Sequence, residues 1–240
     1  MTKLLSKYKA VFFDAGDTLI TIPAAHEIMQ VFLTNYELQI EQNELQVVLS
    51  EAITQFYYNK KDYTDEAITP ESDRAFWVSI YQFVLERLEV DHKLSHDEIH
   101  RCCHELYDVF VSPDYYSLFS DVHHCLDRLQ QMGLRLGLIS NFAPTLRQIC
   151  AKHKIDTYFD PLIVSTEVGL EKPNPEIFSY AMKLAGLRPE DVLYIGDHEI
   201  NDVWAPQQIG MDAIRIIRYE GVAGEGIHSL DELFELERIR

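Results

Sequence analysis

The chain has 240 residues, of which 47% are hydrophobic, so it can bury a core as one large domain with an insertion or as two small domains. Its 39 acidic and 21 basic side chains give a net charge of −18, which repels phosphate backbones and anionic lipids. Nucleic acid and membrane surfaces are therefore excluded as expected partners. The sequence has no apolar run long enough for a membrane helix and no cleavable leader pattern, so we expect a cytoplasmic protein.

The cysteine pattern fits neither a zinc site nor a disulfide framework, because it contains no Cys-x-x-Cys spacing and two of the four cysteines are adjacent. We expect free, buried thiols at Cys102, Cys103, Cys125 and Cys150.

The first predicted element is a buried strand over residues 8–13, a short run of Val and Phe that stops at Asp14. Residues 20–116 then show helical periodicity and no convincing strand. Two apolar stripes lie over residues 45–56 and 76–88, and a third helix should begin at Ser95 with Glu98 completing a capping box. These patterns predict a helical insertion whose hinges are the proline-containing segments 21–24 and 112–116.

From residue 116 onward, strands and helices alternate. A helix over residues 122–132 should end at Gly133, and a helix that begins near Asn174 should end at Gly186. Predicted strands cover 134–139, 162–164, 192–195 and 213–217; the first ends at Ser140, the second leads towards Lys172, and the third ends at Gly196 and Asp197. Alternation of this kind predicts an α/β fold with a doubly wound parallel sheet, whose ligand crevice lies outside the carboxyl ends of the strands.

Four sequence pieces in this order resemble the motifs of the haloacid dehalogenase (HAD) superfamily, in the subfamily whose helical cap is inserted between the first and second motifs. They are Phe12-Phe13-Asp14-Ala15-Gly16-Asp17-Thr18-Leu19, Leu138-Ile139-Ser140-Asn141, Glu171-Lys172-Pro173-Asn174-Pro175-Glu176-Ile177-Phe178, and Ile195-Gly196-Asp197 continuing to Asn201-Asp202. The resemblance covers essentially the whole chain. It implies a Rossmann-like catalytic core made of residues 1–20 and 116–240, and a cap made of residues 21–115.

The resemblance also implies a magnesium-dependent hydrolase that acts on a small phosphorylated molecule. Asp14 would attack the phosphoryl group and form an aspartyl-phosphate, while Ser140 and Lys172 serve as catalytic and substrate-binding groups and Asn141 assists in binding. The implied Mg²⁺ ligands are Asp14, the carbonyl of Gly16, Asp197 and Asp202, with Asp202 in an outer position. The sequence leaves the oligomeric state open.

Gly16 departs from the family pattern, because phosphatases of this superfamily usually carry a second aspartate there as the general acid and base. Loss of such a group typically costs roughly 100-fold to 10,000-fold in rate. Asp17 is one residue too late for its side chain to take that place by simple analogy. Two alternatives therefore stay open: a 2-haloacid dehalogenase, whose halide leaves without a proton, and a weakened member that only binds a ligand.

Several of these residues also have structural interpretations. Ser140 could cap the helix that follows Pro144, and Asp202 could cap the helix that carries Val203 and Trp204. His198 directly follows Asp197 and is the histidine of most interest. In the cap, a polar and aromatic helix end is a candidate contact for an anionic substrate; it comprises Tyr57, Tyr58, Asn59, Lys60 and Lys61.

Overall fold

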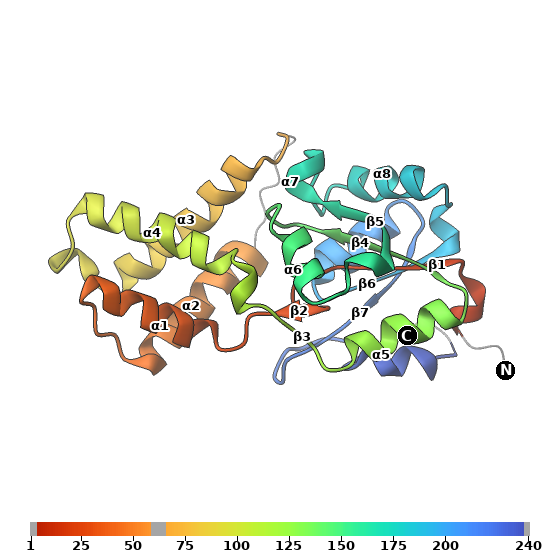
Figure 1. Ribbon diagram of the computed structural model, residues 1–240, viewed down its shortest axis with the longest axis horizontal. Helices are drawn as coiled ribbons and strands as arrows, with labels where there is room; N and C mark the ends of the chain where they lie inside the picture. The colour runs from red at the N-terminus through yellow and green to blue at the C-terminus, as the bar shows by residue number, and fades with distance from the viewer. Residues whose placement is uncertain (1–3, 59–65, 238–240) are drawn as a thin grey trace. The chain divides into compact units, whose positions relative to one another are not determined.

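The structure of the protein is a computed structural model, which describes residues 4–58 and 66–237. The chain divides into two compact units (Figure 1). One unit contains Met1–Thr21 and Tyr116–Arg240, and the other contains Ile22–Tyr115.

The first unit is built on a parallel sheet. Its strands are β1 (Ala10–Phe13), β2 (Ile20–Thr21), β3 (Ser117–Leu118), β4 (Arg135–Ser140), β5 (Phe159–Val164), β6 (Val192–Gly196) and β7 (Asp212–Arg215). Within the described residues, five of these strands pair in the order β5-β4-β1-β6-β7, and every pairing between them is parallel. The short strands β2 and β3 form a separate antiparallel pair where the chain leaves and re-enters this unit.

Both faces of the sheet are covered by helices, as Figure 1 shows for α5 and α8. The helices of this unit are α5 (Val122–Gln131), α6 (Leu146–Lys152), α7 (Ser165–Val168), α8 (Glu176–Ala185) and α9 (Ala205–Gln207). Side chains alternate across β1: Val11 and Phe13 join the apolar cluster of α5 and α6, whereas Ala10 and Phe12 join the cluster of α8. This arrangement confirms the predicted α/β fold with a doubly wound parallel sheet.

The order of the strands places the ends of β4, β1 and β6 side by side. Phe13 lies opposite Leu138 of β4 and opposite Ile195 of β6. Because the three strands are parallel, the residues that follow them emerge at one edge of the sheet. Asp14, Ser140 and Asp197 therefore meet at this edge.

The second unit is helical. Its helices are α1 (Ala25–Leu33), α2 (Gln42–Ile53), α3 (Pro70–Arg87) and α4 (His96–Phe110), and they share one apolar core. The predicted capping box is present: the Ser95 hydroxyl accepts from the Glu98 backbone N–H, and the Glu98 carboxylate accepts from the Ser95 N–H. Among the described residues of this unit there is no strand, as expected.

Two predictions about individual segments are refined by the structure. Strand β7 ends at Arg215, two residues earlier than predicted, because Ile216 and Ile217 pair with Ile227 of the following segment. The cysteines are free and buried as predicted, and burial raises the pKa of the Cys103 thiol to about 11.

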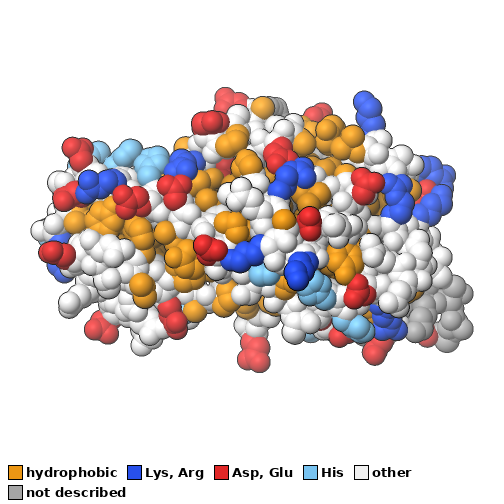
Figure 2. Space-filling model, viewed as in Figure 1, with side chains coloured by type: hydrophobic (Ala, Val, Ile, Leu, Met, Phe, Trp, Pro, Cys, Tyr) orange, Lys and Arg blue, Asp and Glu red, His pale blue; other side chains and the backbone are white. Residues whose placement is uncertain are grey.

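Charged and hydrophobic side chains both reach the surface (Figure 2). On the face shown in Figure 2, acidic and basic side chains lie interspersed, and no continuous basic patch covers it. None of the helices in the described part of the chain has the length and apolar character needed to cross a membrane.

Candidate active site

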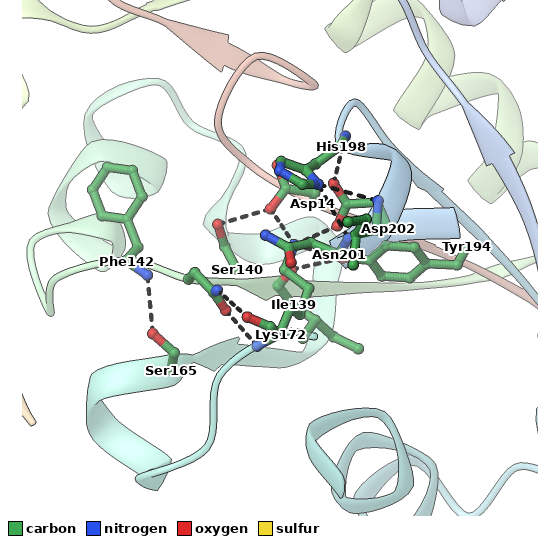
Figure 3. Close-up of polar contacts among 12 residues, drawn as sticks. Asp14, Ile139, Ser140, Phe142, Ser165, Lys172, Tyr194, His198, Asn201 and Asp202 are labelled. Atoms are coloured by element: carbon green, nitrogen blue, oxygen red, sulfur yellow. Dashed lines mark hydrogen bonds and ion pairs between the residues drawn. The ribbon is translucent and has the colours of Figure 1, made fainter. Parts of the chain in front are cut away.

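Asp14 occupies the centre of the candidate site. It directly follows β1, and its side chain is buried and accepts hydrogen bonds from two donors (Figure 3). The Ser140 hydroxyl donates to Asp14 Oδ1 over 3.0 Å, and the Lys172 ammonium donates to the same oxygen over 2.7 Å. Within residues 4–58 and 66–237, no hydrogen bond to Asp14 Oδ2 occurs. One carboxylate oxygen is thus fixed while the other is available to a ligand.

Lys172 joins two carboxylates inside the protein. It lies in the loop between α7 and α8, its side chain is 2% exposed, and its ammonium donates to Asp14 Oδ1 and, over 2.6 Å, to Asp202 Oδ1. Burial by itself lowers the pKa of Lys172, but the charges of Asp14 and Asp202 outweigh that effect and raise it. Lys172 therefore carries its positive charge at neutral pH.

Asp202 reaches the site because Gly196 has no side chain. A Cβ atom at Gly196 would lie 2.4 Å from the Asp202 Cβ, so only glycine permits this approach. The second oxygen of Asp202, Oδ2, accepts from the backbone N–H of His198 over 3.0 Å. Asp202 thus binds Lys172 and also accepts from the backbone at the start of the helical turn Glu199–Trp204, while its outer position at a metal stays a prediction.

His198 caps this same helical turn. Its Nδ1 accepts from the backbone N–H groups of Ile200 and Asn201, both over 3.2 Å. Because Nδ1 is an acceptor in both contacts, the ring carries its proton on Nε2. The imidazole therefore helps to fix the backbone next to Asp197.

Three carboxylates lie close enough to hold a metal ion. Oxygen atoms of Asp14, Asp197 and Asp202 lie within 4.8 Å of one another. Burial raises the pKa of both Asp14 and Asp197, and the charge of Asp202 raises both further. With three acids beside the single ammonium of Lys172, the cluster has excess negative charge, and its oxygen donors suit a hard divalent cation. The residues present therefore fit a metal ion.

Asn141 is bound to the backbone of the lysine. Its Nδ2 donates to the Lys172 carbonyl oxygen over 2.7 Å, and its Oδ1 accepts from the Lys172 N–H over 2.8 Å. Both polar groups of the side chain thus hold the loop that delivers the ammonium. The predicted contact of Asn141 with substrate stays a prediction.

Gly16 and Asp17 form the turn after the Asp14 position. A Cβ atom placed on Gly16 would have no atom within 4 Å, so the missing side chain leaves open space. Asp17 has a left-handed backbone, with φ at 49°, and its carboxylate accepts from Tyr219 over 2.6 Å and from Thr21 over 3.2 Å. The Asp17 carboxylate therefore already accepts hydrogen bonds from Thr21 of β2 and from Tyr219.

A buried arginine holds the same turn from another side. Arg218 donates to the Thr18 carbonyl oxygen through Nε over 3.1 Å and through Nη2 over 2.6 Å. Its Nη1 donates to Asp121 over 2.7 Å, and both side chains are less than a tenth exposed. Sequence reasoning missed Arg218 and Tyr219, which follow β7 without a recognisable motif.

Two further interpretations from the sequence can be compared with the structure. The hydroxyl of Ser140 donates to Asp14, and Thr145, rather than Ser140, precedes α6. In the other unit, the Tyr57 ring stacks on Trp77 with 6.0 Å between the ring centroids. Asn59, Lys60 and Lys61 lie outside the described residues.

Comparison with known proteins assigns the family. A model described as haloacid dehalogenase-like hydrolase matches residues 8–210. The chain is 28% identical over 145 residues to haloacid dehalogenase-like hydrolase domain-containing protein 3 of Xenopus laevis, covering 60% of this chain and 58% of that protein. It is 32% identical over 129 residues to glyceraldehyde 3-phosphate phosphatase of Methanopyrus kandleri, covering 52% and 55%.

The chain thus spans little more than half the length of these two curated relatives. Among solved structures, the HAD-hydrolase YfnB of Bacillus subtilis, bound to magnesium, shares the fold with a TM-score of 0.72 at 17% identity, covering 95% of this chain and 98% of that one. Because the family model matches most of the sequence, the chain belongs to the haloacid dehalogenase-like hydrolase family.

Proposed function

We propose that this hydrolase is a magnesium-dependent phosphatase that acts on a small phosphorylated metabolite, with Asp14 as the nucleophile. The observation that carries the proposal is the single constellation in which Ser140 and Lys172 both bind one oxygen of Asp14 beside the carboxylates of Asp197 and Asp202. The name of a phosphatase relative supports the same reaction class, and a hydrolase that shares the fold is known with bound magnesium.

In the proposed first step, Asp14 Oδ2 attacks phosphorus and the bond from phosphorus to the leaving oxygen breaks. Ser140 and Lys172 hold Oδ1, so that the lone pairs of Oδ2 face the substrate. The product is an acyl phosphate on Asp14, and the leaving oxygen departs with the bonding electrons. In the second step, water attacks phosphorus, releases inorganic phosphate and restores the carboxylate.

The proposed ligands of Mg²⁺ are Asp14, the Gly16 carbonyl and Asp197, with Asp202 in an outer position. When bound, the ion supplies positive charge that reduces the repulsion between an anionic nucleophile and an anionic phosphate. When all three acids are ionised, the carboxylates and the one ammonium have a local charge of about −2, which one divalent cation would neutralise.

The absence of a side chain at Gly16 supports a restriction on the substrate. Because Gly16 offers no proton, the leaving oxygen must depart largely as an anion, which favours aryl and acyl phosphates over alkyl phosphates. We expect the rate to depend steeply on the pKa of the leaving group. Equal rates for aryl and alkyl esters would contradict this part of the proposal.

We also propose that the two compact units of the chain have different roles. Residues 1–20 and 116–240 form the catalytic core, and residues 21–115 form a cap that selects the substrate. The two compact units support this division, and so does the location of every proposed site residue in the first unit. A hydrolase of this kind would require no nucleic acid or membrane partner.

The experiment that tests the proposal measures hydrolysis of p-nitrophenyl phosphate and acetyl phosphate, with magnesium and with EDTA. Asp14→Asn should abolish turnover, because an amide is a poor nucleophile. Asp212→Asn is a matched control, since the Asp212 carboxylate binds Lys7 and Tyr8 and has no proposed part in the site. Equal activity in the wild type and in Asp14→Asn would refute the proposal.

Dehalogenation of a small 2-haloacid is the second candidate, and Gly16 is the observation that favours it. Halide leaves without a proton, so the missing acid would cost this reaction nothing. The cluster of Asp14, Asp197 and Asp202 argues for the phosphatase. Cleavage of a carbon–halogen bond involves no phosphoryl charge, so it needs no metal ion to neutralise one. Metal-independent release of chloride from 2-chloropropionate would favour dehalogenation.

A further inference from the structure

A tyrosine hydroxyl lies within hydrogen-bond distance of the ammonium of Lys172. Tyr194, the third residue of β6, is fully buried. Its hydroxyl accepts from Lys172 Nζ over 3.2 Å and donates to the carbonyl oxygen of Ile139 over 2.8 Å, as Figure 3 shows. Because Ile139 immediately precedes Ser140, the phenol connects the lysine with the strand that delivers the serine.

The hydroxyl completes the hydrogen bonds of the lysine. An ammonium group has three N–H donors, and those of Lys172 point to Asp14, Asp202 and Tyr194. Since the phenol proton is directed at Ile139, its lone pairs face the ammonium. The Ile139 carbonyl of the sheet thus helps to orient this third bond, and Asp202 of the site also acts on the phenol.

The ring of Tyr194 is itself held in place. It packs edge-on against Phe178 of α8, with the centroids 5.1 Å apart and the planes at 87°. Lys172 Nζ lies 5.6 Å from the centroid of the Tyr194 ring and 3.2 Å from its hydroxyl oxygen, so the lysine contacts the hydroxyl and not the face of the ring. The packed ring thus fixes the position of the hydroxyl that binds the lysine.

We propose that Tyr194 is a positioning residue for Lys172 in the phosphoryl-transfer reaction, an inference that rests on the proposed function. Binding of a phosphoryl group requires Lys172 to turn at least one donor away from Asp14 or Asp202, because all three donors are engaged in this structure. The neutral bond to Tyr194 does not compete with the substrate for charge. It keeps the ammonium beside Asp14 while the other two donors are exchanged.

The test compares two tyrosine-to-phenylalanine changes. Tyr194→Phe removes the hydroxyl and keeps the ring. Tyr8→Phe is the matched control, because Tyr8 is also buried in the first unit and its hydroxyl donates to Asp212 over 2.6 Å. A hydrogen bond to a charged group corresponds to about tenfold or more in rate, so we expect kcat/KM to fall by about that factor in Tyr194→Phe. Tyr8→Phe should stay within about twofold of the wild type.

A double-mutant cycle separates positioning from a general structural effect. In a Lys172→Ala background, the additional change Tyr194→Phe should cause a much smaller loss of kcat/KM than in the wild-type background, because the positioning role requires the lysine. A further loss as large as that in the wild-type background would overturn the proposal.

An NMR measurement makes the outcome independent of activity. In substrate-free protein, the ¹⁵N-bound protons of the Lys172 ammonium are assigned by their loss in Lys172→Ala. We expect their resonance to shift or broaden in Tyr194→Phe and to remain unchanged in Tyr8→Phe. An unchanged resonance in Tyr194→Phe would overturn the proposal at any level of activity. If the wild type hydrolyses no phosphate but the resonance still shifts in Tyr194→Phe, the phosphatase function is refuted and the contact between Tyr194 and Lys172 is retained.

Discussion

Replacing Gly16 with aspartate should restore a general acid to this enzyme. The structure provides the space, because a Cβ atom at Gly16 has no neighbour within 4 Å. The backbone there does not require glycine either, since the φ angle of Gly16 is not positive. We therefore expect Gly16→Asp to fold and to place a carboxyl group two residues after Asp14, the proposed nucleophile.

The size of the effect depends on the leaving group. A positioned general acid contributes roughly 100-fold to 10,000-fold when the leaving oxygen needs a proton. An alkyl phosphate should gain a factor in this range, whereas p-nitrophenyl phosphate should gain about tenfold at most, because its phenolate departs readily as an anion. A fourth carboxylate also increases the negative charge around Asp14, so the gain should be measured at saturating magnesium.

The assay is the ratio of kcat/KM for glycerol 2-phosphate to kcat/KM for p-nitrophenyl phosphate. Gly16→Asn is the matched control, because it fills the same space and cannot donate a carboxyl proton. Only Gly16→Asp should raise the ratio. If both variants change the ratio equally, or if Gly16→Asp raises both substrates by the same factor, then proton transfer is not what the native site lacks.

Three other changes test the metal cluster, a close approach and a buried ion pair. Added magnesium should raise the melting temperature of the wild type, and Asp197→Asn should reduce this shift, as differential scanning fluorimetry would detect. Gly196→Ala should lower kcat at least tenfold, because its Cβ would lie 2.4 Å from Asp202 and displace the lysine partner; unchanged kcat would contradict this geometry. Asp121→Asn should cost about 3 kcal/mol of unfolding free energy by leaving Arg218 buried and unpaired. Burial raises the pKa of Asp121, but Arg218 and neighbouring donors outweigh this effect and lower the pKa below its usual value, so the stabilisation is complete above about pH 5 and is lost progressively on further acidification. Urea unfolding between pH 3 and 7 should show a weaker acid dependence in Asp121→Asn than in the wild type.

The strand ends were predictable because two simple signals coincide there. Asp14, Ser140 and Asp197 each terminate or follow a short apolar run, and parallel strands bring their carboxyl ends to one edge. Lys172 lies eight residues beyond β5, and the resemblance to a known motif, rather than periodicity, singled it out. The structure brings all four residues together, and their chemical roles remain predictions.

Other parts of the site were not accessible from the sequence. Tyr194 lies within an apolar strand pattern, in which nothing distinguishes a phenol that contacts a lysine from one that only fills the core. Arg218 and Tyr219 bind the turn after Asp14 across about 200 residues of chain, and a contact at that separation leaves no local signature. The sequence likewise could not show that the Asn141 side chain points to the backbone of Lys172, because this depends on side-chain direction.

The position of β1 in the sheet has a consequence for synthesis of the protein on the ribosome. Its two neighbours, β4 and β6, begin at Arg135 and Val192, so the strand that precedes Asp14 has no partner until most of the chain has been made. Contacts of such large sequence separation form slowly, and an unpaired apolar strand is prone to aggregate. By contrast, the helices from α1 to α4 are contiguous in sequence and share their own core. We therefore expect the inserted unit to fold first, and Asp14 to acquire its neighbours only in the last stage of folding.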